Sequence, residues 1–103
     1  MAATKLSEQE ALKELAQINE GLTTKQHWQI NSGKLVKQFV FKDFIQEFSW
    51  MTQVALIAEK LNNHPEWSNV WNKVDVALVT HDVDGISDLD MQMIKHIENL
   101  NCG

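Results

Sequence analysis

The stretch D-F-I-Q-E-F-S-W-M-T-Q-V-A-L-I-A-E-K-L-N, residues 43–62, has the most regular hydrophobic pattern of this chain. Its apolar side chains recur at spacings of three and four residues, which predicts one helix from about Asp43 to Asn62. Two apolar stripes run along this helix, rotated from one another by about 120°. The first stripe consists of Phe44, Phe48, Met51 and Ala55, and the second of Trp50, Val54, Ile57 and Leu61.

The two stripes also bear on assembly. One small sheet cannot cover both of them in a chain of 103 residues. We therefore expect the second stripe to pack against another subunit, for example the same helix of a symmetric partner. The alternative is that the N- and C-terminal helices of the same chain cover it. The first reading predicts a homo-oligomer.

The residues before this helix predict a shorter helix and a hairpin. Ser7 is a typical helix cap with Glu10 as its capping-box partner, and Gly21 ends the apolar periodicity. Residues 28–41 contain two apolar runs of alternating pattern on either side of an Asn-Ser-Gly turn. They indicate an antiparallel hairpin whose register is not determined.

The residues after the long helix predict a second hairpin and a last helix. Residues 67–71 indicate a short strand, Asn72-Lys73 a two-residue turn, and residues 74–81 a strand of period two. Ser87 would cap the last helix, with Asp90 at its third position. The order αββαββα predicts an α+β fold, with a four-stranded antiparallel sheet and three helices packed on one face.

Composition limits the class of protein. A chain of 103 residues with 44% hydrophobic content suits one domain over residues 1–103. The net charge is −5 and the basic residues are scattered, which disfavours direct binding to nucleic acid. No apolar run approaches the roughly 20 residues of a membrane span, and residues 1–10 do not resemble a secretory signal. The single cysteine, Cys102, excludes an internal disulfide and fits a reducing compartment such as the cytoplasm.

The residues best suited to acid–base chemistry surround the only proline. The segment Glu59-Lys60-Leu61-Asn62-Asn63-His64-Pro65-Glu66-Trp67 is followed by Thr80-His81-Asp82 and then by Asp90. Imidazole can donate or accept a proton near neutral pH. His64 follows a helix end and His81 a strand, so the two side chains could converge on one pocket. Taken alone, each histidine would more often be a surface or structural residue.

These segments, together with the order of the elements, resemble the pterin-4a-carbinolamine dehydratases. Those small enzymes dehydrate the 4a-hydroxytetrahydropterin left by aromatic amino acid hydroxylases, and so support tetrahydrobiopterin recycling. The resemblance implies a hydro-lyase without a cofactor. It implies the catalytic residues His64, His81, Glu59 and Asp90. It implies the substrate-binding residues Asn62, Asn63, His64, Val79, Thr80, His81, Asp82 and Trp67.

The resemblance also suggests individual roles. His64 would contact or protonate the hydroxyl region of the pterin, and His81 would help to bind and polarise it. Periodicity places Glu59 between the two stripes, where we expect partial shielding, and the family pattern would have it orient a histidine. A solvated glutamate at a helix end is the alternative. Asp90 matches the family's acidic position, and an acid there also suits a helix start.

Asn63 departs from the family pattern. Family members usually have two adjacent histidines before the proline, and Asn63 takes the place of the first. An amide can hold a ligand or a water by hydrogen bonds, but it cannot shuttle a proton. If the missing histidine is the main acid–base group, the rate falls by about 10²–10⁴. His64 would then take over part of the task.

Partners follow from the resemblance as well. It implies a tetramer built as a dimer of dimers. Animal members also bind the dimerisation helix of a homeodomain transcription factor, so the broad apolar helix would serve self-assembly or a helical protein partner. A pterin-binding protein with reduced or no turnover is the third reading. We expect no metal, because the sequence has no Cys-x-x-Cys or His-x-x-x-His pair. A eukaryotic protein of this kind would also be expected in the nucleus.

Overall fold

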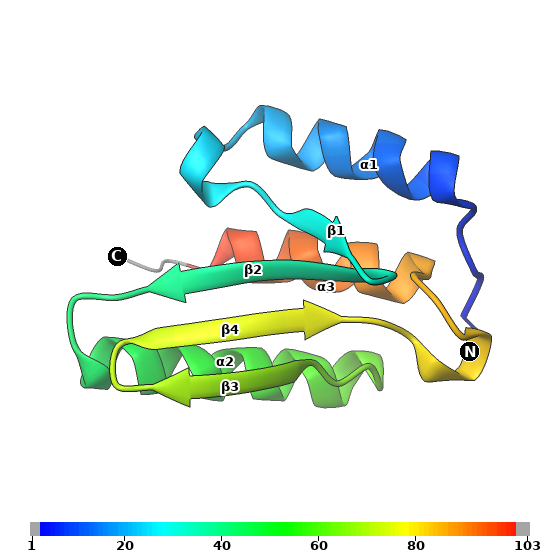
Figure 1. The fold of residues 1–103 in the computed structure, drawn as a ribbon. Coiled ribbons are helices and arrows are strands. Elements are labelled where there is room, and N and C mark those ends of the chain that lie inside the picture. Colours follow the sequence, from blue (N-terminus) through cyan, green and yellow to red (C-terminus); the bar gives the residue numbers. More distant parts are fainter. Residues whose placement is uncertain (1–2, 101–103) are drawn as a thin grey trace.

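The computed structural model describes residues 3–100 and contains three α-helices on a four-stranded sheet (Figure 1). The helices are α1 (Glu8–Glu20), α2 (Phe44–Leu61) and α3 (Asp88–Asn99), with short 3-10 helices η1 (Thr24–Gln26) and η2 (His81–Val83). The strands are β1 (Gln29–Asn31), β2 (Lys34–Val40), β3 (Glu66–Val70) and β4 (Lys73–Leu78). None of the described helices is both long and apolar enough to cross a bilayer.

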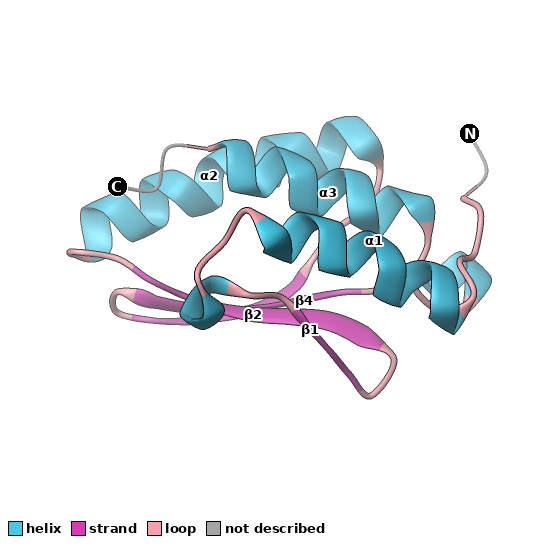
Figure 2. Ribbon diagram, turned by 90° about the horizontal axis from the view of Figure 1, so that it is seen from above, coloured by secondary structure: helices cyan, strands magenta, loops and turns pink. Residues whose placement is uncertain are grey.

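The sheet is antiparallel throughout, in the order β1-β2-β4-β3. Figure 2 shows all three helices in one layer above the sheet. The predicted α+β fold with the order αββαββα is therefore confirmed. Alternate residues of β4, namely Val74, Val76 and Leu78, are buried beneath the helices, as their period of two predicts.

Two details of the second hairpin differ from the prediction. Val70 pairs with Lys73, so the turn consists of Trp71 and Asn72 and lies one residue earlier than expected. Trp71 adopts φ 53°, a left-handed conformation that sequence pattern does not suggest for tryptophan. Strand β4 ends at Leu78, and His81 begins η2 instead of ending the strand. The chain leaves the ladder because Thr80 forms a separate bridge with Gly85.

The helix caps agree with the sequence. Ser7 and Glu10 form the expected capping box at α1, and Ser87 and Asp90 form another at α3. Helix α2 begins where the Asp43 side chain accepts a hydrogen bond from the backbone N–H of Gln46. These caps fix where each helix starts, and so where α3 meets the rest of the chain.

On α2 the second stripe faces the core, and large side chains of the first stripe are exposed, which is the reverse of the expected arrangement. In the second stripe Trp50 and Val54 are buried, and Val54 is 0% exposed. Trp50 packs on the rings of Phe39 and Phe41, with centroid distances of 4.5 and 5.1 Å. The expectation that the second stripe meets another subunit is therefore wrong, because β2 and α3 cover it within the chain. The exposed apolar side chains of α2 are Phe44, Ile45, Phe48 and Leu56.

Candidate active site

The first half of the site lies where α2 ends. Asn62 adopts the left-handed conformation, φ 52° and ψ 43°, and its N–H returns to carbonyls of the last helical turn. The N–H of Asn63 bonds to the Ala58 carbonyl at 3.0 Å. This termination buries the Asn63 side chain and leaves His64 exposed. Pro65 then leads directly into β3.

The second half lies where β4 ends. Val79 and Thr80 continue from the strand, and η2 begins with His81 and Asp82. The two halves form a cavity of about 320 Å³ that is open to solvent and lined by Asn62, Asn63, His64, Val79, Thr80, His81 and Asp82. Seven of the eight side chains expected to bind substrate thus share one cavity. Its volume lies at the lower end of the range for small-molecule sites.

Asp90 joins the two halves from below. Its carboxylate is 0% exposed and accepts three hydrogen bonds, each of 2.9 Å. The donors are Asn63 Nδ2, Thr80 Oγ1 and the backbone N–H of Ser87. Asp90 therefore contacts one cavity residue from each half, and it connects the ends of α2 and β4 to the start of α3. It is not itself among the residues that line the cavity.

His64 and Glu59 form a pair at the rim. His64 Nε2 lies 2.6 Å from Glu59 Oε1, one helical turn back along the chain. The Glu59 side chain is 79% exposed, so the expected shielding between the two stripes is wrong. The contact nevertheless places a carboxylate on the His64 ring, which is the geometry that an orienting acid requires.

His81 has a carboxylate partner that sequence reasoning missed. Its Nε2 lies 2.9 Å from Glu66 Oε2, and Lys34 Nζ lies 2.6 Å from the other oxygen of Glu66. The hydrogen bond from Lys34 is the main cause that lowers the Glu66 pKa, and that from His81 adds to it. The available signal was the position of Glu66 directly after Pro65, but its partners depend on strand register.

Trp67 lies apart from this cavity. It pairs with Val76 across β3 and β4 and packs, partly buried, against the hydrophobic core. Its side of the sheet is the helix-covered side, because Val76 is buried there. Trp67 is thus the one expected substrate-binding residue that does not line the cavity.

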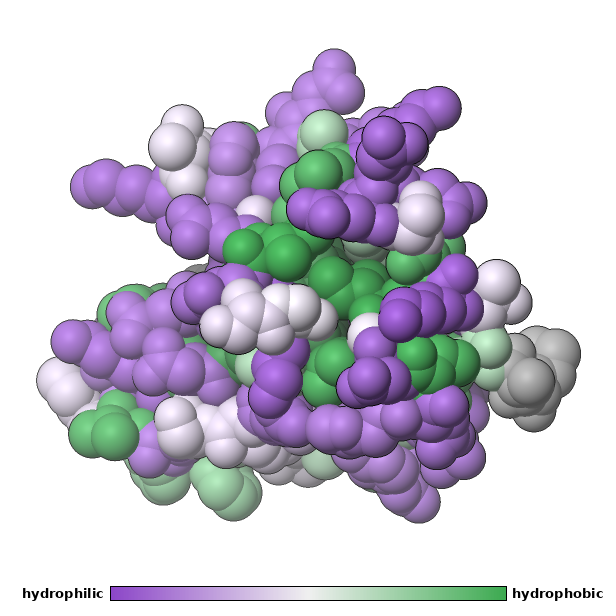
Figure 3. All heavy atoms as spheres, turned by 45° about the vertical axis from the view of Figure 1, so that its right-hand side comes forward, coloured by the Kyte–Doolittle hydropathy of each residue, from purple (hydrophilic) through white to green (hydrophobic). Residues whose placement is uncertain are grey.

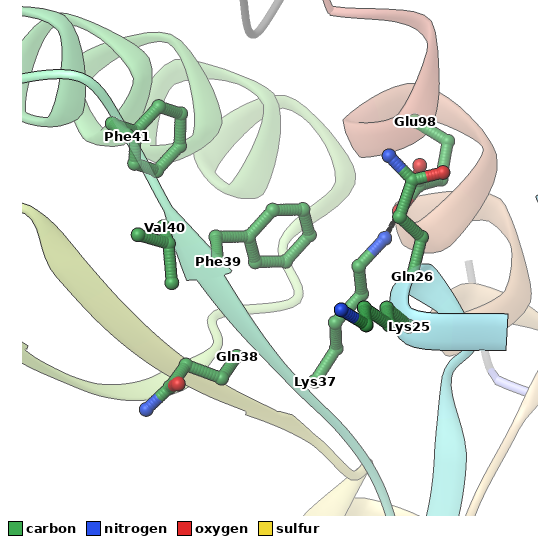
Figure 4. A pocket seen from close by; sticks show the side chains of 8 residues that line it. All are labelled: Lys25, Gln26, Lys37, Gln38, Phe39, Val40, Phe41 and Glu98. Carbon is green, nitrogen blue, oxygen red and sulfur yellow. Dashed lines mark hydrogen bonds and ion pairs between the residues drawn. The ribbon is translucent and has the colours of Figure 1, made fainter. Parts of the chain in front are cut away.

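Other hollows have a different character. Figure 4 shows the Lys37 side chain directed at Glu98, an ion pair of 2.7 Å beside Phe39, at the opposite end of β2. Another hollow, below α1, is lined by residues such as Ala11, Ile30 and Ile86, and apolar surface gathers on this face in Figure 3. Neither contains two histidines. Within residues 3–100, no group of three or more His, Cys, Asp or Glu side chains could hold a metal.

The fold and the cavity define a class of protein: a small α+β domain with two carboxylate-bound histidines at the end of its sheet. A sequence model of the pterin 4 alpha carbinolamine dehydratases matches residues 4–100. The chain therefore belongs to the pterin 4 alpha carbinolamine dehydratase family.

Individual relatives agree with this assignment. The chain is 49% identical over 96 residues to a pterin-4-alpha-carbinolamine dehydratase of Drosophila melanogaster, covering 91% of this chain and 47% of the relative. It is 50% identical over 74 residues to a putative dehydratase of a Synechococcus species, covering 72% of this chain and 80% of that one. The chain thus spans about half of the Drosophila protein.

A solved structure has the same fold. It is a crystal structure of a transcriptional coactivator/pterin dehydratase from Brucella melitensis, with a TM-score of 0.79 and 38% identity. The match covers 92% of this chain and 96% of the Brucella chain. The similarity therefore extends over nearly the whole domain.

Proposed function

We propose that this chain is a pterin-4-alpha-carbinolamine dehydratase, which converts a 4a-hydroxytetrahydropterin into quinonoid dihydropterin and water. The observation that supports it most is the cavity in which His64 and His81, from separate segments, lie together with a carboxylate on each ring. Family membership and the names of the relatives support the same reaction. The product would re-enter tetrahydrobiopterin recycling in the cytoplasm.

The reaction needs two proton movements. The hydroxyl on C4a gains a proton as its C–O bond breaks, and a ring nitrogen of the pterin loses one as the C=N bond forms. His64, as the imidazolium, would protonate the departing hydroxyl, and His81 would bind and polarise the pterin and accept the proton from its ring nitrogen. Glu59 and Glu66 would hold the two rings in orientation. The remaining polar groups of the cavity would bind the pterin edge.

Asp90 and Asn63 would act from beneath the pocket. Asp90 fixes Asn63 and Thr80 through hydrogen bonds, so it would set the shape of the cavity. The Asn63 amide is 6% exposed and donates to Asp90, which supports a binding or structural role for it. We therefore expect turnover that is slower than with a histidine at this position.

We also propose that the chain forms a homo-oligomer, with a dimer of dimers as the expected assembly. The exposed apolar residues of α2 support this, since Phe44, Phe48 and Leu56 are large side chains on one element. Clusters of this kind on a folded surface usually mark an interface. A helical protein partner is the alternative occupant, and the Brucella protein is named a coactivator as well as a dehydratase.

A dehydratase assay with synthetic carbinolamine tests the proposed reaction. Wild-type protein should accelerate dehydration, and His64→Ala and His81→Ala should each lower kcat by about 10²-fold or more. Both variants should bind an oxidised pterin analogue more weakly in calorimetry, and treatment with a chelator should change neither quantity. His96→Ala, on the exposed face of α3, is the matched control. Unchanged turnover and affinity in both site variants would place the chemistry elsewhere.

A further inference from the structure

Glu66 connects three elements through its two carboxylate oxygens. Oε1 lies 2.6 Å from Lys34 Nζ on β2, and Oε2 lies 2.9 Å from His81 Nε2 on η2. Glu66 itself begins β3. Each oxygen therefore has its own partner, and the three side chains meet at the surface, where Glu66 is 41% and His81 77% exposed.

The strand register explains why these residues meet. Ala77 of β4 lies opposite Glu66 on one side and opposite Val36 on the other. Lys34 is two residues before Val36, so its side chain leaves the same face of the sheet. That face is the one not covered by the helices, since the neighbouring β4 residues Val76 and Leu78 are buried on the opposite side.

The carboxylate determines which nitrogen of His81 has the proton. An ionised carboxylate only accepts hydrogen bonds, and the ion pair with Lys34 favours that ionised form. The group facing it on His81 must then be Nε2–H. In the neutral ring this leaves Nδ1 unprotonated and without a contact to Glu66.

We propose that Glu66, anchored by Lys34, is the positioning residue of His81, and that His81 meets the pterin through Nδ1. This inference rests on the proposed dehydratase function. His64 has the same arrangement, since Glu59 also binds its Nε2. Both imidazoles would thus face the substrate through Nδ1, His64 as a protonated donor and His81 as an unprotonated acceptor, although their carboxylates come from α2 and from β3.

A double-mutant cycle in the carbinolamine assay tests the positioning role. Glu66→Ala should lower kcat roughly tenfold with KM changed less than twofold, because the ring is present but no longer oriented. Glu66→Gln should retain part of the rate, since its amide oxygen still accepts from Nε2–H. In a His81→Ala background, Glu66→Ala should have no further effect. Lys34→Met should cause a smaller loss than Glu66→Ala.

The matched control is Asp75→Asn. Asp75 is another exposed carboxylate that accepts from a β2 side chain, Gln38, and within residues 3–100 it forms no hydrogen bond or ion pair with a histidine. This variant should retain wild-type turnover. An equal loss from Glu66→Ala with and without His81, or no loss in either background, would overturn the positioning role.

Nitrogen-15 NMR of the His81 ring gives a readout that does not depend on turnover. In the neutral wild-type ring the nitrogen-15 shifts should show the proton on Nε2, and Glu66→Ala should lower the fraction of that tautomer. A spectrum with the proton on Nδ1 would overturn the proposal even if the enzyme is active. The expected spectrum together with no dehydratase turnover would instead overturn the proposed function and leave the positioning of His81 by Glu66 intact.

Discussion

Asn63 is the residue for which we propose a direct effect on the rate of dehydration. Its side chain lies in the cavity wall and donates to Asp90 at 2.9 Å, so a buried carboxylate faces this position. A histidine there would find the partner that commonly orients a catalytic imidazole. The present amide makes the same hydrogen bond but has no proton that it can transfer.

Asn63→His should therefore raise kcat by about tenfold or more, which is roughly 1.4 kcal/mol of barrier height. Affinity for an oxidised pterin analogue should change much less, because an amide already supplies hydrogen bonds to a ground-state ligand. The gain should disappear in the double variant Asn63→His/Asp90→Asn. If Asn63→His is no faster than wild type, His64 is the principal acid–base group.

Glu47 is a second residue with a testable consequence. It is 0% exposed on α2, and no cation pairs with it among residues 3–100. Burial raises the pKa of the Glu47 carboxyl, and neither of its oxygens has a hydrogen-bond partner among residues 3–100. The folded state thus binds this proton more readily than the unfolded chain does.

The sign of the pH effect follows from that difference. The stabilising contribution of the Glu47 proton is fully present below the ordinary carboxyl pKa of about 4.5, and it is lost as pH rises through the raised value. Glu47→Gln should remove this loss and raise the free energy of unfolding at neutral pH by about 1–3 kcal/mol. Urea unfolding of both proteins from pH 5 to pH 8 measures this difference in the free energy of unfolding. Glu20→Gln, on the surface of α1, should show no such gain.

At the scale of elements, α2 separates the core from the surface proposed for assembly. Phe48 is 54% exposed, whereas Val54 on the other stripe is fully buried. Phe48→Glu should therefore dissociate an oligomer by placing an unpaired charge in the interface, at a cost of several kcal/mol. Light scattering at micromolar concentration measures the mass.

Leu12→Glu on α1 is the matched control, since Leu12 is 51% exposed and lies on another helix. It should leave the mass unchanged. Val54→Glu should instead unfold the chain. A wild-type protein that is monomeric at this concentration would contradict the proposed assembly.

The elements and the two hairpins were predictable, but the strand register and the buried stripe of α2 were not. The spacing of apolar residues in 43–62 indicates a helix, but two stripes of equal spacing do not reveal which one the sheet covers. The turn at Trp71 could not be foreseen, because tryptophan rarely adopts positive φ. In the site, Asn63, His64 and His81 were identified because they occupy a recognisable motif. The role of Glu66 was not predicted, because its contact with Lys34 depends on the strand register, which the local sequence pattern does not reveal.

At the scale of the whole molecule, Asp90 links stability to the site. Its buried carboxylate accepts hydrogen bonds from Asn63 and Thr80, which belong to two other segments, and from the backbone N–H of Ser87, the cap of α3. Hydrogen bonds to a charged group contribute about 1.5–3 kcal/mol each, and deletion of the acceptor leaves buried donors unpaired. Asp90→Ala should therefore lower the free energy of unfolding by at least about 3 kcal/mol.

The same change should lower turnover, because Asn63 and Thr80 would no longer be held in the cavity wall. Chemical denaturation together with the dehydratase assay measures both quantities. Asp88→Ala, in the same first turn of α3 but bonded to the backbone of Thr4, should cost less and leave kcat near wild type. Full activity in Asp90→Ala would contradict the link.

The position of Asp90 also has a consequence for synthesis on the ribosome. The chain emerges from its N-terminus, so His64 and His81 leave the exit tunnel before Asp90 does. Until α3 has formed, Asn63 and Thr80 lack the acceptor that joins them, and the two halves of the pocket are connected only through the β3–β4 pairing and the Glu66–His81 contact. A message truncated after the codon for Ile86 would therefore encode the whole histidine motif and yet give a product whose pocket lacks the Asp90 link between its halves. Chaperones and proteases would act on such a product as an incompletely folded chain, because Met91, Ile94 and Ile97 of the core would be missing as well.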